Sequence, residues 1–300
     1  MPNWFRSISY SKKTLLGLIS IVFAAAYTPI MIRYAQAEHI PSLTIIMLRL
    51  WMISLAMVPF ILPRYWAAFQ GMSKKEWVWV AFAGPLHALN LTLLFFSLQY
   101  TSVLINVVLR QTSPLWTVGF EFLLLHAVFS RKVWVGAVVT VLGTTLVGLG
   151  NLNGVGGGSA PLLGAGLALI NAVTNSIYLL VGRRIRNSLP FLPYSWAVFV
   201  GAAIVTTLMI GVMDTPVWGF SGLGYLWVVL IAVVSQVLGH IPINGVLRHL
   251  SASVTSISLQ FSVVLAAVFA IIFLKEFPSA WQVAGSGLIL AGVVMATRKR

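Results

Sequence analysis

The sequence predicts an all-α integral membrane protein in which ten transmembrane helices form two inverted five-helix repeats. Three observations lead to this prediction: an apolar composition, apolar stretches of membrane-spanning length along the whole chain, and an alternation of positive charge between the segments that connect them. Of the 300 residues, 59% are hydrophobic and only 8% are charged. Because a soluble domain carries roughly 25% charged residues, this chain has too little polar surface to coat a water-soluble globule.

The apolar stretches are about 20 residues long, which is the length that a helix needs to cross the hydrocarbon core of a bilayer. In lipid, only helices and closed barrels satisfy their backbone hydrogen bonds. These runs are too uniformly apolar for the alternating strands of a barrel. The expected spans are 14–33, 42–62, 77–98, 102–125, 132–150, 161–182, 192–213, 223–246, 252–274 and 279–297.

The distribution of Lys and Arg predicts the orientation of these spans. With a cytoplasmic N-terminus, 15 of the 19 basic residues fall in cytoplasmic segments, only Arg33 and Lys275 fall outside, and Arg49 and Arg110 lie within spans. This bias follows the positive-inside rule. We therefore expect a multi-pass protein of the cell membrane (the bacterial inner membrane if the source is bacterial) with both termini in the cytoplasm. The formal charge of +14 then reflects topology, and no nucleic-acid partner is expected.

The first span has an alternative interpretation as a cleaved signal peptide. Lys12 and Lys13 precede an apolar run, and the small residues at 35–37 resemble a cleavage site. The apolar run is longer than that of a signal sequence, and Arg33 lies before the small residues. A retained helix is the interpretation that we favour.

A glycine-rich stretch predicts a linker over 154–160, between a first repeat at 1–153 and an inverted second repeat at 161–300. The halves are similar at an offset near 150, and the matching glycine and hydroxyl residues are Gly136 and Gly143 with Gly285 and Gly292, Thr101 with Ser251, and Thr112 with Ser262. Five spans per half is an odd number, so the second half must enter the membrane in the opposite orientation. Inverted repeats recur in secondary transporters, whose substrate site lies near the bilayer midplane.

Short motifs at corresponding places in the two halves resemble those of one transporter family. They are Thr101-Ser102 after the third span, Ser113-Pro114 in the fourth, Gly136 and Gly143 in the fifth, Leu274-Lys275-Glu276 in the second copy, and Arg49 in the second span. In these residues, and over nearly its whole length, the chain resembles the EamA-type transporters of the drug/metabolite transporter superfamily. Two positions depart from the family pattern: His126 replaces a usual glutamate, and Val264 stands where a second proline would sit.

The resemblance implies a secondary transporter of small metabolites, most often amino acids, which works by alternating access through a central cavity. Helices 1–4 and 6–9 would line that cavity. Among the subfamilies, the aromatic amino acid exporters are the most similar. The resemblance implies export or facilitated diffusion, and an exporter of other organic solutes or drugs is the alternative. The expected partners are a small-molecule substrate and the lipid bilayer, and the sequence is compatible with a monomer or a homodimer.

Three ionisable side chains lie near the middle of predicted spans, namely Arg49, His87 and Arg110. An ionisable group at this depth costs about 2.5–3.5 kcal/mol, so each is a candidate for a functional role. Arginine binds carboxylates through a planar fork, which predicts that Arg49 or Arg110 meets an amino acid or organic acid. His87 is suited to bind a substrate amine. The alternative is that the arginines bind carbonyl groups and hold helix geometry, while His87 is a satisfied interior residue.

Polar and aromatic side chains complete the candidate substrate site. They are Asn90, Asn171, Asn175, Gln236, His240, Tyr27 and Tyr178. Amides within spans either line a pathway or hold helices together. His240 lies close to Pro242, where freed backbone carbonyls are tolerated beside a cavity. The tyrosines alternatively anchor helix ends at the membrane interface.

The chain has no Cys, a single Asp and no H-E-x-x-H motif, so a thiolate site and a metal-dependent enzyme are not expected. We expect no catalytic residues, no metal and no cofactor. The missing Walker A motif argues against an ATP-driven pump, whereas a channel stays an alternative from another class. No acidic residue lies at midplane depth, which favours facilitated diffusion or exchange of neutral, zwitterionic or anionic solutes over proton-coupled export of cations.

Overall fold

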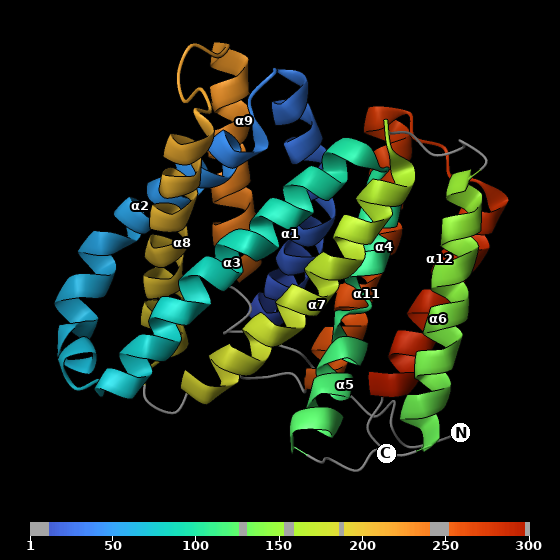
Figure 1. Ribbon diagram of the computed structural model, residues 1–300, viewed down its shortest axis with the longest axis horizontal. Helices are drawn as coiled ribbons and strands as arrows, with labels where there is room; N and C mark the ends of the chain where they lie inside the picture. The colour runs from blue at the N-terminus through green and yellow to red at the C-terminus, as the bar shows by residue number, and fades with distance from the viewer. Residues whose placement is uncertain (1–11, 126–130, 153–158, 186–188, 241–251, 298–300) are drawn as a thin grey trace.

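The computed structural model describes residues 12–125, 131–152, 159–185, 189–240 and 252–297, and the regular secondary structure of these ranges is helical (Figure 1). The α-helices are α1 (Lys12–Ala37), α2 (Ser42–Gln70), α3 (Lys74–Tyr100), α4 (Val103–Arg110), α5 (Ser113–Leu125), α6 (Arg131–Leu152), α7 (Pro161–Ile185), α8 (Phe191–Met213), α9 (Gly222–Val233), α11 (Ala252–Phe269) and α12 (Ala280–Thr297). Two π-helical segments, η2 (Val234–His240) and η3 (Ala270–Leu274), continue α9 and α11.

The length and composition of these helices suit a membrane. Within the described ranges, α1, α2, α3, α7 and α8 are long and apolar enough to cross a bilayer, and shorter apolar helices lie in 222–236, 261–274 and 280–295. The second predicted span ended at residue 62, but α2 continues to Gln70 and contains Pro59 and Pro63. A span predicted from the length of an apolar run alone does not show that the helix continues beyond that run.

The predicted span at 102–125 is interrupted, which corrects the expectation of one continuous helix. The structure has α4 and α5 in its place, separated by Gln111 and Thr112. Pro114 explains the break, because proline has no N–H to donate and restricts the residue before it. Ser102 begins α4 by accepting a hydrogen bond from the backbone N–H of Ile105 (3.3 Å). The result is a helix of only eight residues.

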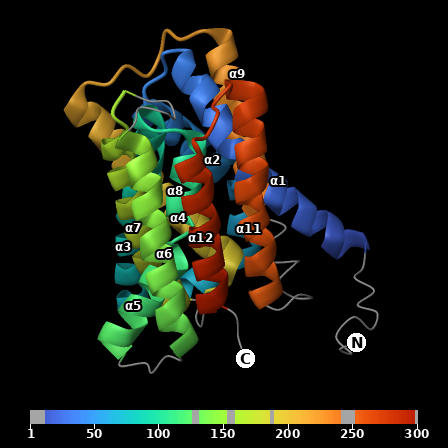
Figure 2. The same cartoon turned by 90° about the vertical axis from the view of Figure 1, so that its right-hand side faces the viewer.

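The helices are arranged so that segments far apart in the sequence lie side by side. α3 packs against both α7 and α8, α2 packs against α8 and α9, and α1 packs against α11, η2 and α9. α6 and α12 run next to each other at one side of the bundle (Figures 1 and 2). In Figure 2 the first turns of α1 lean away from the neighbouring helices, and Leu16 and Ile19 in these turns are exposed.

α6 and α12 meet along a glycine seam, formed by Gly143, Gly285 and Gly292 with Gly136. A Cβ atom added at Gly143 would lie 2.7 Å from the carbonyl oxygen of Gly285, and one at Gly285 would lie 2.6 Å from that of Gly143. At Gly292 the neighbour would be the carbonyl oxygen of Gly136. Small residues allow such close backbone approach, which favours van der Waals packing where lipid supplies no hydrophobic driving force.

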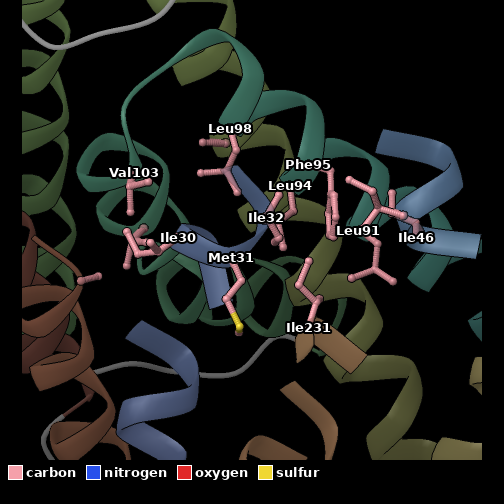
Figure 3. Packing of buried hydrophobic residues seen from close by; sticks show 14 of the residues in the cluster. Ile30, Met31, Ile32, Ile46, Leu91, Leu94, Phe95, Leu98, Val103 and Ile231 are labelled. Carbon is pink, nitrogen blue, oxygen red and sulfur yellow. The ribbon is translucent and has the colours of Figure 1, made fainter. Parts of the chain in front are cut away.

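The largest apolar core lies between α1, α2, α3, α4 and α9. Figure 3 shows its centre, where side chains from these helices point toward one another. Ile30, Ile32, Phe95 and Leu98 each have 0% of their surface exposed. This core lies toward the end of the bundle that carries Glu38, Asp214 and Glu276, which we call the acidic end.

The predicted linker at 154–160 falls mostly outside the described residues. The boundaries of the two repeats therefore stay a prediction.

Candidate substrate cavity

Two adjoining cavities occupy the middle of the bundle. The larger has a volume of about 320 Å³ and the smaller about 280 Å³. They share the lining residues Ala25, Arg110, Asn175 and Leu179, and we call the two together the central cavity. A pocket of several hundred Å³ is the usual size for a small organic ligand.

The backbone around the central cavity departs from regular α-helix in three places. Pro29 lies inside α1 and lines the cavity, and it leaves the carbonyl group of Ala25 without its usual helical donor. The break between α4 and α5 lies beside the cavity-lining residues Arg110 and Gln111. The third place is η2, a π-helix of the kind often found at functional sites. Irregular backbone at membrane depth is tolerated where it lines a cavity.

Arg110 ends α4 and is held by a short polar network between α3 and α7. Its Nε donates to Oδ1 of Asn171 (2.9 Å), and the Asn171 side-chain amide donates to the backbone carbonyl of Asn90. Asn90 returns the contact by donating to the carbonyl of Asn171 (3.2 Å). These bonds fix the direction of the guanidinium through Nε, and among the described residues no hydrogen bond engages its two terminal nitrogens.

Arg49 on α2 is the second cation of the central cavity. Only 5% of its surface is exposed, and its guanidinium carbon lies 5.5 Å from the centroid of the Phe95 ring. A cation over an aromatic face is stabilised by about 0.5–2 kcal/mol. Arg110 lines the same cavity as Arg49. The two charges repel each other, which raises the free energy of the empty site.

Aromatic and amide side chains form another part of the wall. The His87 ring packs against Tyr178 with 5.0 Å between centroids and against Phe199 with 5.6 Å. Asn175 donates to the hydroxyl of Ser113 (2.9 Å), which ties α7 to the start of α5. The cavity therefore offers an apolar ring surface beside amide and hydroxyl groups.

Most of the predicted site residues come together here. The residues that line the central cavity are Arg49, His87, Asn90, Arg110, Asn171, Asn175 and Tyr178. Gln236 is buried next to the lining residue Ser235. Tyr27 lies instead in an aromatic cluster, stacked on Phe23 (5.5 Å) and edge-on to Phe269 (5.5 Å). The side chain of His240 lies outside the described residues, although its backbone ends η2.

Several further residues line the central cavity but were not among the predicted site residues. They are Thr28, Pro29, Ser113, Pro114, Ser235 and Ser262. The pairs Thr28-Pro29 and Ser113-Pro114 share a detectable signal, because each places a hydroxyl beside a proline within an apolar run. Such a pair marks a point where a membrane helix loses a backbone hydrogen bond and can face a cavity.

The acidic end is closed by a polar contact that we call the clasp, formed by Arg33, Leu98, Val103 and Glu276. Arg33 binds Glu276 (3.0 Å) and the carbonyl oxygen of Leu98 (2.6 Å). The other carboxylate oxygen of Glu276 accepts a hydrogen bond from the backbone N–H of Val103 (2.8 Å), the first residue of α4. A carboxylate at a helix N-terminus is stabilised by the helix dipole.

The apolar core lies between the clasp and the central cavity. Ile32 on α1 and Leu94 on α3 line the cavity. Leu98, one turn farther along α3, and Val103, the first residue of α4, belong to both the core and the clasp. At the acidic end, therefore, packed side chains and an ion pair separate the cavity from the surface.

Both halves of the chain match one protein family. Residues 12–149 and 162–298 match the EamA-like transporter family, which accounts for most of the chain. The chain belongs to the EamA-like transporter family. The family predicted from the sequence motifs is thereby confirmed, whereas the aromatic amino acid subfamily stays a prediction.

Two curated relatives of this EamA-like chain are named as transporters or solute carriers. An "uncharacterized transporter" of Clostridium kluyveri is 23% identical over 211 residues, which span 69% of this chain and 68% of that protein. Solute carrier family 35 member G1 of Homo sapiens is 23% identical over 234 residues, which span 76% of this chain and 64% of the human protein. The family and these names support a multi-pass membrane transporter of small solutes rather than an enzyme.

The fold is shared with a protein of known crystal structure. That chain is 19% identical in sequence, and the two superimpose with a TM-score of 0.61 over 96% of this chain and 97% of the other. At this identity the likeness concerns the fold alone.

Proposed function

We propose that this protein is a secondary carrier of small organic solutes that bear a carboxylate, with amino acids as the first candidates. The observation that carries the proposal is the pair of arginines, Arg49 and Arg110, in the lining of one cavity. A guanidinium binds a carboxylate through two parallel N–H donors, and the bond is stronger in a low-dielectric cavity. Asn90, Asn175 and the His87–Tyr178 rings offer partners for the remainder of the solute.

The proposed architecture is ten spans in two inverted five-helix repeats, 1–153 and 161–300, joined by the linker 154–160. The two family matches support it, because one falls in each half. The glycine seam supports it as well: exchanging the matched glycines between the halves converts the Gly143–Gly285 contact into the Gly292–Gly136 contact. A two-fold relation between the repeats would produce this pairing.

The positive-inside bias supports a cell-membrane location with both termini in the cytoplasm, the inner membrane if the source is bacterial. In that orientation the acidic end faces outward. A monomer or a homodimer is compatible with this arrangement, because one chain supplies a central cavity by itself.

Alternating access is the mechanism that we propose. The clasp and the apolar core close the acidic end in the present state, so solute would exchange there only after both separate. No acidic side chain is found among the residues described as lining the cavity, which favours facilitated diffusion or exchange over coupling to a proton. Export or uptake is then set by the solute gradient.

Purified protein in liposomes tests the proposal. Uptake of radiolabelled amino acids and organic acids, including aromatic amino acids, should saturate with concentration, and unlabelled solute on the opposite side should accelerate it. Cationic dyes represent the alternative of a drug exporter and should compete poorly. Single-channel conductance without saturation, or obligatory proton antiport of an organic cation, would contradict the proposal.

A further inference from the structure

The electrostatic balance of the central cavity narrows the choice of solute. The whole sequence contains five acidic residues, so the position of each can be checked. Glu76 caps the start of α3, and Asp214 ends α8. Glu38 accepts a hydrogen bond from Ser221 at the acidic end, and Glu276 belongs to the clasp.

Glu121 is the fifth acidic residue, and it lies on α5 seven residues beyond the cavity-lining Pro114. At 1.5 Å per residue this is about 10 Å along the helix axis. Among the carboxylates whose side chains the structure describes, none forms an ion pair with Arg49 or Arg110, so these groups leave both positive charges of the cavity without a counter-ion.

Both arginines also have donors to spare among the described residues. Arg110 uses Nε for Asn171, and the guanidinium carbon of Arg49 lies over the Phe95 ring. A guanidinium has five N–H donors directed in its plane. The terminal nitrogens of both side chains are thus suited to receive an oxyanion each.

We infer that the preferred solute carries two acidic groups on a short chain, one bound by Arg49 and the other by Arg110. This inference rests on the proposed carrier function and names its substrate class. A zwitterion would neutralise one arginine but would bring an ammonium group close to the other. A solute with two carboxylates neutralises both, so each guanidinium gains a charge-assisted hydrogen bond.

The same charge balance predicts how the carrier moves. An empty cavity holds two unneutralised cations at membrane depth, which opposes its reorientation. The loaded form has both charges neutralised and reorients more readily. We therefore expect exchange of one dianion for another, with little net flux when the opposite side contains no such solute.

The test is competition against radiolabelled succinate uptake by the wild-type protein in liposomes. The matched competitor is monomethyl succinate, which has the same chain and a single carboxylate. Glutamate, with two carboxylates and an amine, and phenylalanine, with one carboxylate and an amine, distinguish acidic amino acids from simple dicarboxylates. Succinate or glutamate should compete at least about tenfold better than monomethyl succinate or phenylalanine, as expected for one lost charge-assisted contact.

Variants assign the two contacts. In Arg49→Gln and in Arg110→Gln the advantage of succinate over monomethyl succinate should fall to within about threefold, because one carboxylate has lost its partner. Arg64→Gln is the matched control, since Arg64 is exposed outside the cavity, and it should keep the full ratio. If a Gln variant does not fold, the corresponding Lys variant keeps the charge, loses the fork and should show a reduced ratio.

The outcomes separate this inference from the proposed function. Saturable flux of other panel members with equal competition by succinate and monomethyl succinate would overturn the two-acid inference and leave the carrier function standing. No saturable flux of any solute on the panel would overturn both. A full succinate advantage that persists in both Gln variants would also overturn the assignment to Arg49 and Arg110.

Discussion

Arg33 and Arg110 are both buried at least in part, yet their surroundings differ. At the clasp, Arg33 uses both terminal nitrogens on groups of the protein, the Glu276 carboxylate and the Leu98 carbonyl. In the central cavity, Arg110 lines the open space, and the hydrogen bond that it makes within the described part of the chain uses Nε. The comparison shows that Arg33 is paired with groups of the protein, whereas Arg110 has donors that the proposed solute would engage.

The largest effect is expected from removing each of these two arginines in turn. Arg110→Ala should lower the transport efficiency about 100-fold or more, because the contact to the solute is lost, and should lower the melting temperature modestly through the lost hydrogen bond to Asn171. Arg33→Ala should lower the melting temperature more than the flux, since it leaves Glu276 without its ion-pair partner. Flux assays and thermal unfolding in detergent measure the two effects. Equal loss of flux and of stability in both variants would remove the distinction.

A second test separates the structural frame from the cavity. Gly285→Ala places a Cβ 2.6 Å from the backbone oxygen of Gly143 and should destabilise the protein by about 1–3 kcal/mol. Gly287→Ala is the matched control on the same helix, because nothing lies within 4 Å of the added atom. Thermal unfolding should distinguish the two. Solute selectivity should be unchanged in both, and an altered preference in Gly285→Ala would argue against a purely structural seam.

A third test opens the acidic end. Glu276→Gln removes the ion pair with Arg33 and the charge at the start of α4, worth about 1 kcal/mol in a partly exposed setting. Opening at that end should become about fivefold more frequent. Because the chain has no Cys, Leu94→Cys provides a unique label in the cavity wall, and its reaction with an impermeant thiol reagent should accelerate accordingly.

Glu38→Gln is the control for this experiment, since Glu38 lies at the same end but contacts Ser221 rather than the clasp. It should leave the labelling rate of Leu94→Cys unchanged. Equal acceleration by both substitutions would mean that general loss of charge, and not the clasp, controls access.

The smallest effect is expected at the ring wall. His87→Phe keeps an aromatic ring against Tyr178 and Phe199 but removes both ring nitrogens. Solutes with an amine should lose about threefold in affinity, whereas solutes without one should lose less. Competition curves for glutamate and succinate measure the difference. A uniform loss for both would assign His87 to packing alone.

Much of the fold could be predicted from the sequence because lipid imposes simple rules on length and charge. Seven of the ten candidate site residues line the central cavity. A polar side chain within an apolar span faces the interior of the bundle or a cavity, because its exposure to lipid costs free energy. The break at Gln111–Thr112 was missed because apolar length is blind to a lost backbone bond, although Pro114 marked it. Tyr27 could not be placed, because a residue on a helix of uncertain rotation faces a cavity or a neighbouring helix equally well.

The ion pair of the clasp could not be predicted from the sequence, for a different reason. Arg33 and Glu276 were both assigned to outer segments, but they are 243 positions apart and nothing in a single sequence pairs them. Only the packing of α1 against α11 and η3 brings the two side chains to the same end of α4.

The shortness of α4 has a mechanical consequence. Eight residues make a rod of about 12 Å, and non-helical residues at both ends allow it to tilt as one piece. The backbone N–H of Val103, the first residue of α4, donates a hydrogen bond to Glu276, and the last residue, Arg110, lines the cavity. A solute that moves Arg110 at one end of α4 also moves Val103 at the other end. If solute binding changes the strength of the Glu276–Val103 contact by some factor, that contact must change the solute affinity by the same factor. Binding of a solute in the middle of the membrane can thus affect the acidic end through a helix of about two turns.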